Sequence, residues 1–231
     1  MWMHEVGMIV VGILCGSLLF SRYLPRKLKN VDVEALSEDH NPGTANAMKY
    51  AGVPIGVLCL VGDIFKGTIP VHMAVRMGLV TGSLFPLIMA APVFGHAYSL
   101  YHKGKGGKAI AVSFGVMIGL MPIHSELVIL LCALYLFFSL IVVIKPHIRR
   151  TRVTFFLFGC GAVALTAIEA VSIQLCLGAL LVAGIVVHKN SLRQQLKEET
   201  AVRNTAPVCA EAFNVSAVVP DGRLENTGSA K

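Results

Sequence analysis

Seven apolar segments, separated by short polar connections, constrain the fold of this chain more than any other feature of its sequence. A helix takes about 20 residues to cross the hydrocarbon core of a bilayer, and fewer where it is partly buried in protein. The segments therefore predict an all-α, polytopic integral membrane protein with about seven transmembrane helices. They are Val6 to Phe20, Ala51 to Phe65, Val71 to Val93, Ala109 to Met121, Leu127 to Ile144, Val153 to Ala167 and Val171 to Val187, of which the second and fourth are short.

The composition excludes an ordinary soluble protein. Of the 231 residues, 55% are hydrophobic and 14% are charged, whereas about a quarter are charged in typical soluble domains. The first apolar segment has no A-x-A-like cleavage site, so a retained helix is expected rather than a signal peptide. The six cysteines form no CxxC pair. Because no His, Cys and carboxylate spacing matches a metal site either, neither a metal nor a cofactor is expected.

Lysine and arginine are concentrated in four connections: residues 21–50, 102–108, 145–152 and the tail from His188. These alternate with nearly uncharged turns at residues 67–70, 122–126 and 168–170. Cytoplasmic connections of membrane proteins carry an excess of Lys and Arg. An odd number of spans therefore predicts an outside N-terminus, a cytoplasmic C-terminus and a basic cytoplasmic face on a multi-pass plasma-membrane protein. This topology accounts for much of the net charge of +7, and no nucleic acid partner is expected.

The connection His102 to Lys108 combines three glycines with three lysines. Glycine lets a backbone approach an anion and point N–H groups at it, and lysine adds mobile positive charge, so this loop is a candidate phosphate site. It is not a P-loop, because G-x-x-x-x-G-K-[ST] would need glycine at His102 and Ser or Thr at Ala109.

The same region carries a family resemblance. Gly95-His96, Tyr98, Tyr101 and Lys105-Gly106-Gly107-Lys108 with Ile110-Ala111 resemble the G-H-x-F-P-x-F…K-G-G-K-G-V-A motif of the PlsY family of integral membrane acyl-phosphate:glycerol-3-phosphate acyltransferases. Residues 41–52 resemble its G-S-G-N-x-G-A-T-N-x-x-R-x-x-G motif, and residues 63–70 its D-x-x-K-G-x-x-P run. Weaker similarities link residues 152–154 to R-x-x-S and residues 188–199 to H-R-x-N-I-x-R-L…E. The resemblance reaches about residue 199.

This resemblance implies transfer of a fatty acyl group from acyl phosphate to glycerol 3-phosphate at a membrane, giving lysophosphatidic acid for phospholipid synthesis. Acyl phosphate, glycerol 3-phosphate and membrane lipids would be the binding partners. Expected catalytic residues are His188, Lys108 and His96. Expected substrate-binding residues are Lys105, Gly106, Gly107, Lys108, Asn41, Gly43, Asn46, Lys49, Thr154, Asp63 and Lys66.

Some of these residues also have a purely structural interpretation. Asp63 and Lys66 are spaced to pair on one helix face, so a simple ion pair is the alternative to a substrate contact. For His96 the alternative is a helix-end histidine with a local hydrogen-bond partner.

The sequence departs from the family pattern at several positions. Glu38-Asp39-His40 replaces G-S-G, and Lys49 replaces an arginine. Two alternatives to the acyltransferase therefore stay open: an acyltransferase for a different phosphorylated acceptor, and a non-catalytic transporter or lipid-binding relative. We expect residues 1–199 to form the membrane domain and the polar residues 200–231 to form a disordered cytoplasmic tail.

Overall fold

The computed structural model describes residues 2–37 and 39–216, and their side chains as far as residue 195. Residues 1, 38 and 217–231 lie outside the described part. Within the described residues every regular element is a helix, as the apolar pattern predicts. The chain divides into two compact units, Met1–Arg193 and Gln194–Lys231, and the candidate site lies entirely in the first.

The first apolar segment forms a helix that breaks near its end. Helix α1 (Trp2–Ser17) stops two residues before α2 (Phe20–Lys29) begins. The Lys66 side chain donates a hydrogen bond to the carbonyl of Leu18, in the break. A backbone carbonyl freed from a helix needs such a partner when it is shielded from water.

Two short helices lead from this break to the next long helix. Asp32 accepts hydrogen bonds from the first backbone N–H groups of α3 (Val33–Leu36), and Gly43 precedes α4 (Thr44–Ala51). A small apolar cluster packs α2 and α4 against α5. Its buried members are Ala47, Ala51, Ile55 and Cys59.

Helix α5 (Val53–Arg76) corrects the predicted turn at residues 67–70, because it runs without a break through Gly67 and Pro70. A Cβ atom at Gly67 would lie 2.4 Å from the Val112 carbonyl oxygen, so this glycine serves close helix packing rather than a turn. The apolar stretch from Val71 to Val93 is consequently two helices, with the connection near residues 77–84.

The remaining helices follow the predicted order with shifted boundaries. After a 3₁₀ turn (Leu79–Thr81) come α6 (Phe85–Ala97), a second 3₁₀ turn (Leu100–His102), α7 (Ile110–Gly119), α8 (Glu126–Leu136) with a π-helical turn (Phe137–Ile141), α9 (His147–Ala167) and α10 (Ile173–Ser216). Helix α9 therefore starts at His147 rather than at Val153. Helix α10 continues through residues 200–216, where the sequence predicts the start of a disordered tail. Residues 217–231 lie outside the described part, so the division of the chain at residue 200 stays a prediction.

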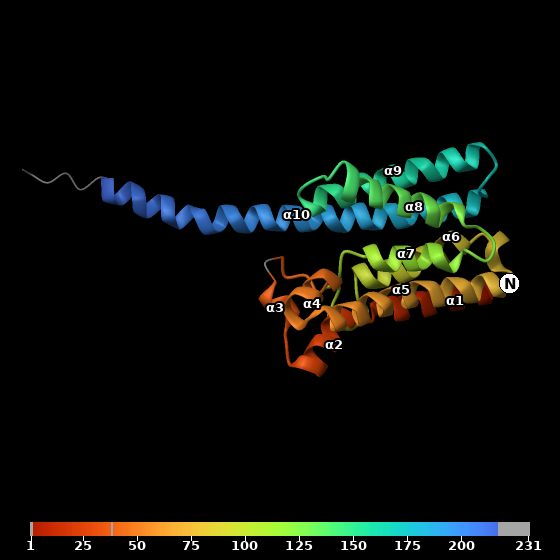
Figure 1. Ribbon diagram of the computed structural model, residues 1–231, viewed down its shortest axis with the longest axis horizontal. Coiled ribbons are helices and arrows are strands. Elements are labelled where there is room, and N and C mark those ends of the chain that lie inside the picture. Colours follow the sequence, from red (N-terminus) through yellow and green to blue (C-terminus); the bar gives the residue numbers. More distant parts are fainter. Residues whose placement is uncertain (1, 38, 217–231) are drawn as a thin grey trace, which may run out of the picture. The chain divides into compact units, whose positions relative to one another are not determined.

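One apolar core joins α1 and the helices from α5 to α10, which run side by side in Figure 1. Helix α1 packs on α6, α5 on α7, and α8 on α9. Core residues from successive helices include Met8, Val71, Phe85, Val116, Leu127, Phe158 and Leu175.

Many apolar side chains also point outward, including Val61 and Phe65 on α5. Three helical stretches, Trp2–Lys29, Val53–Arg76 and Ile173–Gln195, are long and apolar enough to cross a membrane. Such outward apolar faces match a protein whose solvent is lipid.

Candidate functional site

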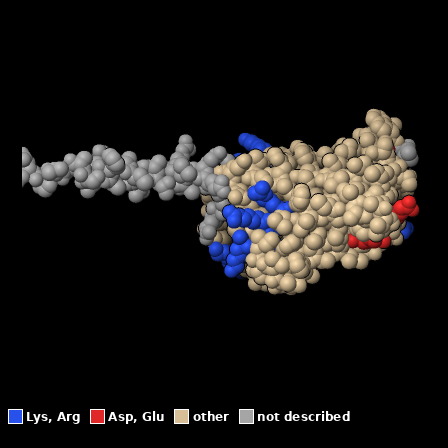
Figure 2. All heavy atoms as spheres, turned by 90° about the horizontal axis from the view of Figure 1, so that it is seen from above, with Lys and Arg blue, Asp and Glu red and all other residues tan. Residues whose placement is uncertain are grey.

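Polar residues from three separate segments meet at one end of the first unit. Figure 2 shows most of the visible Lys and Arg side chains gathered at one end, whereas visible Asp and Glu side chains mark the other. Hydrogen bonds join residues 37–46, the loop 104–108 and α10 at the basic end. Three of the four basic connections predicted to share a face are therefore in contact.

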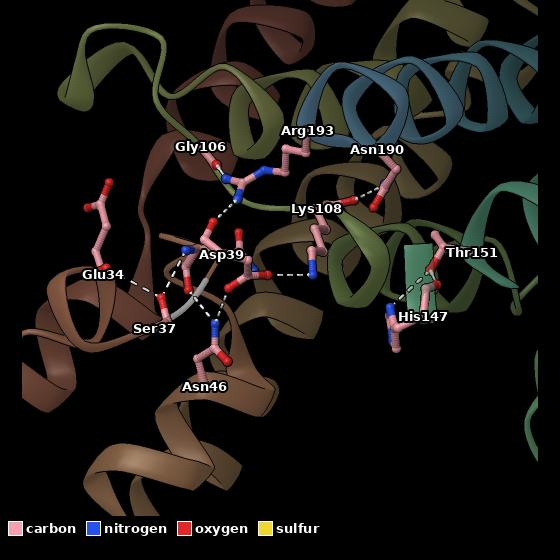
Figure 3. Close-up of polar contacts among 11 residues, drawn as sticks. Glu34, Ser37, Asp39, Asn46, Gly106, Lys108, His147, Thr151, Asn190 and Arg193 are labelled. Atoms are coloured by element: carbon pink, nitrogen blue, oxygen red, sulfur yellow. Dashed lines mark hydrogen bonds and ion pairs between the residues drawn. The ribbon is translucent and has the colours of Figure 1, made fainter. Parts of the chain in front are cut away.

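Lys108 stands at the centre of this convergence (Figure 3). Its ammonium lies 2.8 Å from Asp39 Oδ2, and the Asn46 amide donates to Asp39 Oδ1 at 2.8 Å and to the Asn41 carbonyl at 2.9 Å. The side chains of Lys108 and Asp39 are 18% and 16% exposed. Both groups are therefore largely desolvated but still reached by solvent.

Helix α10 supplies the other side of the site. Arg193 donates to the Gly106 carbonyl at 2.6 Å and to the Asp39 carbonyl at 3.3 Å. The Asn190 amide donates to the Val186 carbonyl at 2.8 Å, and it makes a longer contact of 3.4 Å with the Lys108 carbonyl. We call Asp39, Asn46, Lys108, Asn190 and Arg193 the Lys108 cluster.

The two adjacent glycines of the loop are required by close packing against His96. A Cβ atom at Gly106 would lie 2.0 Å from the His96 carbonyl oxygen, and one at Gly107 would lie 2.2 Å from His96 Nε2. The Gly107 N–H donates to the His96 carbonyl, the Lys105 N–H to His102 and the Gly104 N–H to Ser99. These three amides are thus engaged by backbone carbonyls of residues 96–102, so positive charge must come chiefly from side chains.

Asp63, Lys66 and His96 form a second, buried group between α5 and α6. Lys66 Nζ lies 2.8 Å from Asp63 Oδ1, as their spacing predicts, and also donates to the Leu18 carbonyl at 2.5 Å. His96 Nδ1 lies 3.8 Å from the same Asp63 oxygen, too far for a hydrogen bond. Lys66 of this group binds the Leu18 carbonyl in the break between α1 and α2, and the His96 carbonyl accepts from the Gly107 N–H.

The other predicted site residues have varied surroundings. Asn41 and Thr154 are buried, and their side-chain oxygens Oδ1 and Oγ1 find no hydrogen-bond partner among the described residues. Lys105 and His188 are exposed. Lys49 lies with its ammonium 5.0 Å from the Tyr50 ring centre.

Gly43 contributes backbone only, since its N–H donates to the Asn41 carbonyl and its own carbonyl accepts from Ala47. The structure therefore brings Asn46, Lys108 and the glycine pair together. It leaves His188 on an outward face of α10.

Sequence reasoning missed Asp39 and Arg193 as members of the site. The motif comparison identifies Asp39 only as a departure from the family pattern, and no local signal links it to Lys108, 69 positions away. Arg193 and Asn190 share the phase of the buried α10 residues Val186 and Ala183, a 3.6-residue pattern that could have identified them.

The electrostatics of the cluster keep Asp39 ionised. Burial alone would raise the pKa of its carboxyl, but the hydrogen bond and charge of Lys108, helped by Asn46 and Arg193, lower the pKa below its ordinary value. Lys108 therefore faces an ionised carboxylate at neutral pH. A second anion would have to bind Lys108 beside this carboxylate or displace it.

Fold and site define an all-helical membrane protein with a cluster of basic, acidic and amide side chains at one end. The family model described as glycerol-3-phosphate acyltransferase matches residues 6–198. The chain belongs to the glycerol-3-phosphate acyltransferase family.

Similar curated proteins carry the same description. Glycerol-3-phosphate acyltransferases of Shewanella woodyi, Myxococcus xanthus and Pseudomonas syringae pv. tomato are 35%, 34% and 40% identical to the chain over 136, 116 and 116 residues. These matches cover 59%, 50% and 50% of this chain, and the chain spans 65%, 60% and 59% of the relatives' lengths.

The crystal structures of PlsY, an integral membrane glycerol 3-phosphate acyltransferase, have a similar fold. The glycerol 3-phosphate form aligns with a TM-score of 0.70 at 20% identity, over 87% of this chain and 94% of that one. The lysophosphatidic acid form aligns with a TM-score of 0.69.

Proposed function

We propose that the chain transfers a fatty acyl group from acyl phosphate to the hydroxyl of glycerol 3-phosphate and releases lysophosphatidic acid and phosphate. The convergence of Lys108, Asn46 and Arg193 beside a glycine pair, in a chain of this family, is the observation that carries the proposal. Two phosphorylated substrates need a site whose positive charges offset their mutual repulsion.

The reaction needs no covalent enzyme intermediate. An acyl phosphate is a mixed anhydride with an activated carbonyl carbon. The glycerol hydroxyl oxygen attacks that carbon, the bond to the phosphate oxygen breaks, and the hydroxyl proton is taken up by a base. Holding both reactants together and stabilising the departing phosphate would supply most of the rate.

Lys108 is the residue we assign to the phosphate, because its ammonium is at the centre of the cluster and still 18% exposed. Lys105 and Lys49 would extend the positive field, and Asn41, Asn46 and Thr154 would orient the acceptor through their side-chain polar groups. Of the two histidines, exposed His188 can be reached by substrate and solvent for proton transfer. Buried His96 would position Gly107.

Insertion in the membrane would let the acyl chain of the substrate reach the site from the lipid. We propose seven spans formed by α1, α5, α6, α7, α8, α9 and α10, with the N-terminus outside and the Lys108 cluster facing the cytoplasm from the plasma membrane. The exposed apolar side chains of α5 then face lipid, where each buried methylene of a substrate adds about 0.8 kcal/mol. Residues 1–199 would be the catalytic domain and 200–231 a cytoplasmic tail.

Topology has its own test. Single cysteines placed at His188 and at Lys103 in an otherwise cysteine-free chain should both be labelled from the cytoplasmic side of inside-out vesicles by an impermeant maleimide. Labelling of the two positions from opposite sides would sink the proposed site.

The activity test uses full-length protein in detergent with acyl phosphate and labelled glycerol 3-phosphate, with acyl-CoA as a parallel donor. Lysophosphatidate formed only with acyl phosphate is the expected product. Complete absence of product with either donor would refute the proposal and leave both alternatives standing, the transporter or lipid-binding relative and the acyltransferase for another acceptor.

One observation favours a second candidate, an acyltransferase with another phosphorylated acceptor: the Asp39 carboxylate already lies against Lys108. Product formed from a different phosphorylated alcohol, with none from glycerol 3-phosphate, would select it.

A further inference from the structure

The Asp39 carboxylate occupies the position within the Lys108 cluster that best suits a bound anion. One oxygen receives the Lys108 ammonium and the other the Asn46 amide, both at 2.8 Å. Arg193 donates to the main-chain carbonyl of the same residue at 3.3 Å. Charge-assisted contacts of this kind, to two oxygens of one group, are those by which proteins also hold phosphate.

This arrangement is a property of this chain's sequence. The G-S-G pattern that residues 38–40 replace would put a neutral serine at the position of Asp39, whereas here a full negative charge lies against Lys108. The carboxylate is 16% exposed, so water screens it incompletely and its repulsion of a second anion is correspondingly strong.

Asp39 is also held by contacts that can be exchanged. It lies in the connection between α3 and α4, outside either helix. The backbone beside it is fixed independently of its carboxylate, because the Asn41 N–H donates to the Ser37 hydroxyl and the Asn46 amide also reaches the Asn41 carbonyl. The carboxylate can therefore leave Lys108 by side-chain rotation while the connection keeps its path.

We infer that Asp39 is a specificity-determining residue: an internal anion that competes with the phosphate of a ligand for the Lys108 ammonium. A bare phosphate gains little by replacing one anion with another. A ligand that also brings hydroxyl groups or an acyl chain has additional binding free energy with which to displace the carboxylate. The inference rests on the proposed function in taking Lys108 as the phosphate ligand.

The test measures binding of inorganic phosphate to the full chain in detergent by titration calorimetry, without turnover. Asp39→Asn keeps the shape and removes the charge, and Asp39→Ser introduces the residue of the family pattern. Both should bind phosphate about tenfold or more tightly than the wild type.

Asp32→Asn is the matched control. Asp32 also pairs with a basic side chain, Arg26, but its side chain is 40% exposed and lies outside the Lys108 cluster. Its phosphate affinity should equal that of the wild type. Asn also preserves the cap of α3, since Asn and Asp are equally good N-cap residues.

The double variant Asp39→Asn with Lys108→Gln completes a thermodynamic cycle. The gain in phosphate affinity should vanish in it, because the cation for which the two anions compete is gone. A gain that persists without Lys108 would overturn the inference. So would Asp39→Asn and Asp39→Ser proteins that melt like the wild type yet bind phosphate no more tightly, which would leave Asp39 as a positioning residue for Lys108.

The inference and the proposed function can fail separately. Tighter phosphate binding by both variants, in a chain that never forms lysophosphatidate, would support the inference and refute the proposed formation of lysophosphatidate. Acyl transfer by the wild type, with phosphate affinity unchanged in both variants, would support the proposed function and refute the inference.

Discussion

Two lysine–aspartate pairs in this protein have the same N–O distance of 2.8 Å but very different surroundings. Lys66 and Asp63 lie three residues apart on α5 and are each 3% exposed. Lys108 and Asp39 come from different segments and are 18% and 16% exposed. Distance alone therefore says little about what such a pair does.

Burial and the replaceability of the partners explain the difference. Lys66 has a second fixed acceptor, the Leu18 carbonyl, so the protein itself satisfies the buried charge. Among the described residues Lys108 has one polar side-chain partner, and a ligand anion could take the place of that partner. The Lys66–Asp63 pair therefore stays paired, whereas the more exposed Lys108–Asp39 pair can exchange its anion.

Removing one charge of the buried pair should have the largest effect. Lys66→Met leaves the Asp63 carboxylate and the Leu18 carbonyl without their partner, and breaking a buried pair in this way costs about 3–5 kcal/mol. We expect a large fall in the free energy of unfolding, measured by denaturant titration in detergent micelles. The double variant Asp63→Asn with Lys66→Met should recover part of the loss, and a single variant as stable as the wild type would show that the pair is not structural.

Removing the charge of the more exposed lysine, Lys108, should affect turnover instead. Lys108→Gln removes the cation assigned to the phosphate, and turnover should fall about 10²–10³-fold. The melting temperature should fall less than for Lys66→Met, because the side chains of Lys108 and Asp39 are 18% and 16% exposed rather than 3%, and water can reach the carboxylate that loses its partner. Steady-state kinetics with acyl phosphate, beside a thermal melt of the same sample, separates the two effects. Turnover close to that of the wild type would remove Lys108 from the mechanism.

Gly107→Ala tests the physical link between the buried group of Asp63, Lys66 and His96 and the Lys108 cluster. The added methyl would lie 2.2 Å from His96 Nε2, so the loop or the ring must shift, at a cost of about 1–3 kcal/mol for overpacking. Turnover should fall by about tenfold or more because Lys108 follows directly in the chain. Gly184→Ala, where an added Cβ meets nothing within 4 Å, is the matched control and should retain activity.

The sequence predicts much of this division because charge patterns and helix periodicity are local signals. The alternation of basic and uncharged connections predicts which segments meet, and contacts between residues 39, 108 and 193 confirm that they do. The i, i+3 spacing of Asp63 and Lys66 predicts their pairing, which the 2.8 Å distance confirms. Family motifs predict the fold class.

Three features escaped prediction for physical reasons. Gly67 and Pro70 suggested a turn, but a spanning helix tolerates both where neighbouring helices pack closely. The pairing of Asp39 with Lys108 joins residues 69 positions apart, a contact that only the tertiary fold creates. The rotation of α10 decides that Asn190 and Arg193, rather than His188, lie against the loop; motif matching ignores that rotation.

The smallest effect should come from one of the two ion pairs that share the shortest distance, Arg26–Asp32. Arg26 and Asp32 approach to 2.5 Å but are 60% and 40% exposed, so water competes for both groups and the side chains lose entropy on pairing. Arg26→Gln should change the free energy of unfolding by less than about 0.5 kcal/mol and leave turnover unchanged, as the same melts and kinetics would record. A loss approaching that of Lys66→Met would mean that proximity, rather than burial, governs these pairs, and the contrast between the two lysines would need another cause.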